Sequence, residues 1–124
     1  MRRLTLSQIL SMQDILIKET GGTEGIRDEG LLDSALHTPF QTFDREYVYK
    51  TLEAKAARLG YGLIKNHPFV DGNKRIGMLA MMIFLELNGI EIHCTDQEII
   101  EAGLKLASGE MDYNQFLEWI LEHN

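Results

Sequence analysis

The sequence predicts an all-α protein, a compact single-domain bundle of helices packed around one buried central helix. Helix N-cap signals recur along the chain, apolar residues repeat at helical spacing, and one central segment is apolar on nearly every side. Residues 40–49 are aromatic and ambiguous, and a loop or one small β-hairpin is as consistent with them as a helix. A length of 124 residues is typical of one domain, so residues 1–124 are expected to form a single unit.

The first two helices are predicted from their N-caps. Thr5 and Gln8 form a capping box for a helix that runs to about residue 19, where a glycine pair ends it. Asp28 is expected to cap a shorter helix that stops before Pro39, because the residue before a proline avoids the helical region.

Two longer helices are predicted in the middle of the chain. Leucines and alanines at helical spacing place the first over residues 49–66, and Pro68 ends it. The second begins at Gly72 or Asn73 and runs to residue 88. Because it is apolar on nearly all sides, this helix is expected to be buried among the others.

The last two helices are again predicted from capping boxes. Thr95 with Glu98 opens one of them, and Asp112 with Gln115 opens the other. Residues 90–93, which precede them, are expected to form a short extended piece.

The composition excludes several classes of function. With 44% hydrophobic and 25% charged residues, the chain is expected to fold and not to be disordered. The net charge of -7 argues against direct binding to nucleic acid, which depends on Lys and Arg. The single Cys94 fits a reducing compartment, no apolar run typical of a signal peptide opens the chain, and residues 76–87 are too short to span a membrane. A cytoplasmic protein without membrane contact is therefore expected.

The most unusual stretch is HPFVDGNKR, residues 67–75, at the start of the central helix. The first N–H groups of a helix have no intrahelical partner and carry partial positive charge, so a helix tip suits an anion. Asn73, Lys74 and Arg75 are rotated by about 100° from one another, so they surround a ligand on the helix axis. An amide, an ammonium group and a guanidinium fork suit a polyphosphate, and Gly72 lets it approach the backbone.

Two further residues of this stretch supply chemistry. The carboxylate of Asp71 would repel a phosphate, but a bridging Mg²⁺ binds carboxylates together with phosphate oxygens and removes the conflict. A neutral imidazole at His67 can accept the proton of an attacking hydroxyl, as phosphoryl or nucleotidyl transfer requires. Simpler interpretations stay open at this point: Asp71 can merely cap the helix, and His67 can be an ordinary turn residue. A metal hydrolase is disfavoured because no third ligand is evident.

The same nine residues are similar to the active-site motif of the Fic/Doc superfamily, His-x-Phe-x-(Asp/Glu)-(Gly/Ala)-Asn-(Gly/Lys)-Arg, at every fixed position. The segments GGTEGIRDEGLLDSAL and LELNGIEI resemble the Doc (death on curing) branch, the toxins of Phd/Doc-type toxin–antitoxin modules. The resemblance implies that His67 is the general base, that Asp71 binds Mg²⁺ and that Phe69 anchors the loop. The residues that hold the phosphates of ATP are then Gly72, Asn73, Lys74 and Arg75.

The chain departs from the pattern of the AMP-transferring Fic proteins at two positions. Lys74 stands where that pattern has a second glycine, and Met78 where it has a second arginine. Doc-type members share both departures and resemble kinases that transfer the γ-phosphate of ATP. The resemblance therefore implies phosphorylation of a Ser or Thr hydroxyl in a target protein, expected to be elongation factor Tu, which blocks protein synthesis. AMP transfer by the same site and a non-catalytic helical module that binds an antitoxin are the alternatives.

Two other segments bear on regulation and substrate docking. The resemblance implies a flap that docks the target peptide at residues 39–49. The sequence TGGTEG, residues 20–25, fits the loose signature of Fic autoinhibitory helices, but three glycines in six residues disfavour a helix, and we interpret the match as coincidence. Inhibition is expected instead from a separate, Phd-like antitoxin whose disordered segment folds into a groove of this protein.

Overall fold

A computed structural model describes residues 1–124 and consists of six α-helices, one short 3₁₀ turn and one two-stranded antiparallel hairpin. The all-α prediction is confirmed, and so is the small hairpin. The elements in chain order are α1 (Leu6–Thr20), α2 (Glu29–His37), η1 (Thr38–Phe40), β1 (Thr42–Phe43), β2 (Glu46–Tyr47), α3 (Leu52–Lys65), α4 (Asn73–Leu87), α5 (Asp96–Ser108) and α6 (Tyr113–His123).

The four N-caps expected from the sequence are all present. Thr5, Thr95 and Asp112 each form a complete capping box with the residue three positions later. The carboxylate of Asp28 accepts a hydrogen bond from the backbone N–H of Leu31 at 2.9 Å. Local hydrogen bonding therefore sets where these four helices begin, as the sequence predicts.

One helix boundary and one short segment differ from the expectation. Helix α3 begins at Leu52 and not at residue 49, because Thr51 caps it. The buried ammonium group of Lys55 donates a hydrogen bond to the carbonyl of Tyr49 at 2.6 Å, which holds that carbonyl outside the helix. Residues 90–93 form no strand. They lie in a loop, tied to α6 by the hydrogen bond from the His93 N–H to the His123 carbonyl (2.7 Å).

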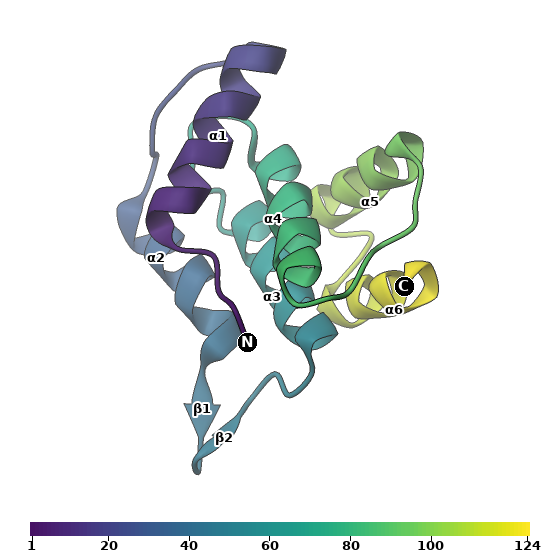
Figure 1. Cartoon of the computed structure of the whole chain (residues 1–124). Helices are drawn as coiled ribbons and strands as arrows, with labels where there is room; N and C mark the ends of the chain where they lie inside the picture. Colours follow the sequence, from purple (N-terminus) through teal and green to yellow (C-terminus); the bar gives the residue numbers. More distant parts are fainter.

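Helix α4 lies at the centre of the molecule, as its apolar sequence predicts. It packs along α3, with α1 on one side and α5 on the other, and α6 packs on α3 (Figure 1). Ile76, Ala80, Met81 and Phe84 of this helix are fully buried. A central helix enclosed in this way holds its N-terminal end, where the HPFVDGNKR motif begins the helix, in a fixed position.

Helices α3 and α4 approach closely where two glycines face each other. A Cβ on Gly77 would lie 2.6 Å from the Cγ1 atom of Ile64 and 2.9 Å from the carbonyl oxygen of Gly60. Gly60 is restricted in the same way, since a Cβ on this residue would lie 3.0 Å from the Gly77 carbonyl oxygen. The contact between the two central helices therefore has no room for a methyl group.

We expect Gly77→Ala to destabilise the protein by about 1–3 kcal/mol, the usual effect of overpacking a core. The matched control is Gly103→Ala in the interior of α5, where the new Cβ would meet its nearest atom at 3.6 Å, an ordinary contact. That variant is expected to be neutral or to gain up to about 1 kcal/mol from helix propensity. Chemical denaturation measures both. Equal effects of the two changes would contradict the close approach.

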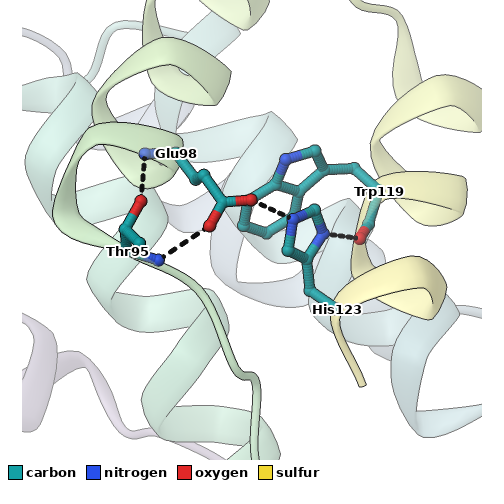
Figure 2. A network of polar contacts seen from close by, with 4 residues as sticks. All are labelled: Thr95, Glu98, Trp119 and His123. Carbon is teal, nitrogen blue, oxygen red and sulfur yellow. Dashed lines mark hydrogen bonds and ion pairs between the residues drawn. The ribbon is translucent and has the colours of Figure 1, made fainter.

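A polar network joins α5 to the end of α6 (Figure 2). His123 contacts the Trp119 carbonyl through Nδ1 at 2.6 Å and the Glu98 carboxylate through Nε2 at 2.8 Å. Both partners are acceptors, so only the protonated ring satisfies both. The Trp119 carbonyl and Glu98 accordingly raise the pKa of His123, and the N–H of Thr95 together with His123 lowers the pKa of Glu98.

We expect this network to make stability depend on pH. The contribution of His123 is complete below the ordinary pKa of 6.5 and is lost as the pH rises through its raised folded-state pKa. The contribution of Glu98 is present above its ordinary value of 4.5 and is lost only as the pH falls through its lowered folded-state pKa. The unfolding temperature of the wild type should therefore fall above pH 6.5 more steeply than that of His123→Gln.

The control for this measurement is His93→Gln, which changes an exposed imidazole outside the network and keeps the backbone bond of residue 93 to the His123 carbonyl. It should follow the wild-type pH curve between pH 4.5 and 8.5, a range that begins at the ordinary pKa of Glu98. If His123→Gln and the wild type give parallel curves, the ring does not carry the charge that its two acceptors require.

None of the helices is both long enough and apolar enough to cross a lipid bilayer.

Candidate active site

The HPFVDGNKR motif lies around a small polar cavity at the N-terminal end of α4. The cavity has a volume of about 220 Å³. Every residue to which the sequence assigned a catalytic, phosphate-binding or metal-binding role lies on its wall. The lining residues are Ile64, His67, Asp71, Gly72, Asn73, Lys74, Arg75 and Ala107.

The tip of α4 has the geometry of an anion site. The first hydrogen bond of the helix runs from the Ile76 N–H to the Gly72 carbonyl (3.0 Å), so the N–H groups of the three residues between them have no intrahelical partner. Gly72 is the N-cap and adopts the left-handed conformation with φ of 79°. Lys74 and Arg75 are both exposed at this tip. Two cations and three open N–H groups therefore meet at one helix end.

Asp71 does not cap α4, so the simpler interpretation of this residue is wrong. The N-cap is Gly72, and no side chain makes a capping bond to this helix. The exposed Asp71 carboxylate accepts from the Gly72 N–H at 2.8 Å and from the Thr23 N–H at 3.3 Å. Its carbonyl accepts from the side-chain amide of Gln13 at 2.7 Å. The carboxylate is thus held in place by backbone N–H groups and stays open to the cavity.

Asn73 is used differently from the expectation that its amide contacts a phosphate. Its side chain is only 5% exposed, and it accepts from the Phe69 N–H and donates to the Phe69 carbonyl, both at 3.0 Å. Phe69 itself is 1% exposed and anchors the loop in the core, as expected. The Asn73 side chain therefore closes the loop, and the group that it leaves for a ligand is its backbone N–H.

His67 lies at the end of α3 in a left-handed backbone conformation, with φ of 50°. Histidine is among the residues that tolerate this conformation, which clusters at functional sites. Arg27 stabilises the turn, because its guanidinium donates to the carbonyls of His67 (2.7 Å) and Asn66 (3.0 Å). The imidazole is exposed at the cavity. No pattern in the sequence indicated this contact, because Arg27 lies 40 residues from His67 along the chain.

A short extended segment runs alongside the motif loop. Ile26 forms an isolated antiparallel bridge with Phe69. The Arg27 N–H donates to the Pro68 carbonyl at 2.7 Å, and the Val70 N–H donates to the Gly25 carbonyl at 3.0 Å. The loop that carries His67 and Asp71 is therefore paired to the segment after α1 by backbone hydrogen bonds.

The residues of the cavity fit a metal held between one carboxylate and phosphate oxygens. No group of three or more His, Cys, Asp and Glu side chains that could hold a metal ion exists in the structure. Mg²⁺ is commonly bound by one or two carboxylates together with substrate phosphates and waters, and Asp71 beside the tip of α4 offers that donor set.

The expectation that residues 39–49 form a flap beside the site is wrong. The hairpin projects near the N-terminal end of α3, whereas the motif follows its C-terminal end (Figure 1). A helix of 14 residues separates them, a length of about 21 Å.

The segment TGGTEG does not form an autoinhibitory helix. Its residues 21–25 are not helical, so the prediction that the three glycines disfavour a helix is confirmed.

An apolar groove of about 420 Å³ adjoins the site between α1, α4 and α5. Met78, where the AMP-transferring pattern has an arginine, is 2% exposed on its floor. Lys74 and Arg75 line both the groove and the polar cavity. The other lining residues are Leu16, Leu79, Met82, Ile99, Ile100, Gly103 and Leu104, and we call this surface the α1–α4–α5 groove.

Comparisons with known proteins place the chain in a family. The protein named Toxin Doc from Mycolicibacterium smegmatis is 38% identical over 90 residues, which cover 70% of this chain and 69% of the relative. Protein kinase doc from Escherichia phage P1 is 24% identical over 111 residues, which cover 90% of this chain and 86% of the relative. Residues 3–85, which include the whole motif, match the Fic/DOC family. The chain is therefore a member of the Fic/DOC family.

Proposed function

We propose that this protein is the toxin of a toxin–antitoxin module and a kinase that transfers the γ-phosphate of ATP to a Ser or Thr hydroxyl of a target protein. The observation that carries the proposal is the convergence of a histidine, a carboxylate and two cations on one cavity at a helix tip. The names of the two relatives, Toxin Doc and Protein kinase doc, support the toxin and the kinase respectively.

Each residue has a distinct task in the proposed reaction. The His67 imidazole takes the proton of the target hydroxyl as its oxygen forms the new bond to phosphorus. Lys74, Arg75 and the first N–H groups of α4 bind the phosphates and offset their charge. Asp71 would hold Mg²⁺ against the phosphate oxygens. Bound ATP supplies the γ-phosphoryl group, whose bond to the β-phosphate oxygen breaks to leave ADP.

The apolar environment of Met78 supports phosphate transfer over AMP transfer. An arginine at this position would have to lie on the buried floor of the groove, where Gly103 of α5 faces Met78. The second cation fork of the AMP-transferring pattern therefore has no counterpart here. Two cations and one helix tip remain to orient the nucleotide.

The test uses ATP labelled on the γ-phosphate and, in a parallel reaction, on the α-phosphate, with Mg²⁺ and a bacterial lysate. Transfer of the γ label alone to protein is the expected result, and purified elongation factor Tu is the proposed acceptor. Transfer of the α label would replace the kinase by an adenylyltransferase. Absence of transfer from either, together with normal growth of cells that express the protein, would leave only the non-catalytic binding module.

We further propose that the antitoxin occupies the α1–α4–α5 groove. Two helices flank an apolar floor there, which suits an amphipathic helix, and the two phosphate-binding cations lie at its edge. A segment bound in the groove with an acidic side chain at those cations would compete with ATP.

The test places a charge on the apolar surface of the groove. Leu104→Asp, at a 52% exposed position of the groove, should abolish capture of the antitoxin. Leu121→Asp on α6 is the control, because it is 51% exposed and lies outside the groove, and it should leave capture unchanged.

A further inference from the structure

We propose that the end of α1 and the turn after it are part of the active site: Thr20 positions Arg75 for the phosphates, and the backbone of Gly22 and Thr23 positions Asp71 for the metal. This inference rests on the proposed function and deepens it. The same residues begin the TGGTEG sequence, whose resemblance to an autoinhibitory helix is a coincidence. Their actual contacts give the segment a different role.

Thr20 fixes the guanidinium of Arg75. Its hydroxyl donates its single hydrogen to the Leu16 carbonyl at 2.6 Å, so the oxygen is free only to accept. It accepts from the Nη1 group of Arg75 at 2.7 Å. Arg75 is otherwise exposed and forms no ion pair. An arginine that is held in this way loses less rotamer freedom when it binds a phosphate than an unrestrained one.

The next residues of the turn fix the carboxylate of Asp71. A Cβ on Gly22 would lie 2.6 Å from the Oδ2 atom, so only glycine leaves room for the carboxylate at this place. The N–H of Thr23 donates to the same oxygen at 3.3 Å. Gln13, from the same helix α1, holds the Asp71 carbonyl at 2.7 Å. The proposed metal ligand is therefore supported from one side by α1 and by the turn behind it.

These contacts reach both ligand-binding side chains from one segment that is far away in the sequence. Thr20 is 55 residues from Arg75, and Thr23 is 48 residues from Asp71. A turn that only connected α1 to α2 would need neither contact. We infer that Thr20, Gly22 and Thr23 are positioning residues, which set the geometry of the site without touching the reacting atoms.

The first test compares Thr20→Val with Thr20→Ser by calorimetric titration with ATP in the presence of Mg²⁺. We expect Thr20→Val to raise the dissociation constant about tenfold, which is the loss of one hydrogen bond to a charged group. Thr20→Ser keeps the hydroxyl and should restore binding. The control is Thr38→Val at the end of α2, where the hydroxyl makes the same bond, to the Ser34 carbonyl at 2.7 Å, but no arginine is bound to it.

The second test compares Gly22→Ala with Gly109→Ala by titration of Mn²⁺ and ATP, with free Mn²⁺ followed by electron paramagnetic resonance. Both glycines have positive φ, 112° and 87°, so both changes strain the backbone. Nothing lies within 4 Å of a Cβ on Gly109, whereas the Cβ on Gly22 would displace the carboxylate. We expect Gly22→Ala to weaken Mn²⁺ binding about tenfold or more and Gly109→Ala to leave it unchanged.

The outcomes separate this inference from the proposed function. A wild-type protein that binds neither ATP nor Mn²⁺ with ATP would overturn both. If the wild type binds them and Thr20→Val and Gly22→Ala bind equally well or more tightly, the positioning role is wrong and the proposed function stands. Weaker binding by both variants, with rescue by Thr20→Ser, supports the inference.

Discussion

Replacing His67 by asparagine is expected to lower transfer from ATP by about 10²–10⁴-fold, the usual effect of removing a general base, while the protein stays folded. Asparagine suits this position because it tolerates the left-handed conformation that His67 adopts, with φ of 50°. The side chain is exposed, so its exchange removes no core contact. The loss of activity therefore reports the missing proton acceptor and not a misplaced loop.

The measurement is single-turnover transfer of the γ label to target protein, together with nucleotide binding. His67→Asn should bind ATP with nearly wild-type affinity, because the groups proposed to bind phosphate lie on α4. His93→Asn is the control, since it changes an exposed histidine outside the cavity. A variant that retains more than about a tenth of the wild-type rate would show that the base lies elsewhere, because a positioned base contributes about 10²-fold or more.

Much of the fold could be predicted because its signals are local. A capping box needs only two residues three positions apart, and Thr5, Thr95 and Asp112 form theirs as expected. The central position of α4 followed from its composition alone. Lys55, by contrast, shows why the start of α3 was missed, since its buried ammonium group holds backbone carbonyls that precede the helix.

The candidate site was also predictable, because its residues are contiguous and a helix start brings them to one cavity. The groups that support it were not. Gln13, Thr20 and Arg27 reach the motif loop or the tip of α4 from 40–58 residues away, and single residue types at such separations have no periodic pattern. The flap was misplaced because it rested on the resemblance alone, whereas the chain order places the hairpin before α3 and the motif after it.

The support of the site is divided between two segments with different roles. Arg27 and the backbone on either side of it hold the loop that carries His67. Helix α1 and the turn behind it hold Asp71 and Arg75. Changes at Arg27 should therefore affect the base and the stability of the loop, whereas changes at Thr20 should affect the binding of nucleotide.

Asn73→Ala is expected to destabilise the protein by about 2–5 kcal/mol, because it leaves the N–H and the carbonyl of Phe69 without partners. Both groups are buried with the 1% exposed phenyl ring, so water cannot replace the lost bonds without opening the loop. Such a loss is a large share of the roughly 5–15 kcal/mol that stabilises an ordinary domain.

Asn73→Asp tests the same contact without changing the size of the side chain. The carboxylate can still accept from the Phe69 N–H, but its second oxygen faces the Phe69 carbonyl and repels it. It also places a charge at a position that is 5% exposed, so we expect at least as large a loss as for alanine. Asn114→Ala, at an exposed position of α6, is the control and should stay within about 0.5 kcal/mol of the wild type.

The two measurements, unfolding in denaturant and binding of ATP, decide what Asn73 does. If its side chain closes the loop, the free energy of unfolding falls for both variants, and the binding of ATP falls because the tip of α4 loses its fixed neighbour. If its amide instead binds phosphate directly, Asn73→Ala would weaken ATP binding while unfolding stayed unchanged. The two hydrogen bonds to Phe69 favour the first result, because they hold the amide inside the loop, where a side chain that is 5% exposed offers little surface to a ligand.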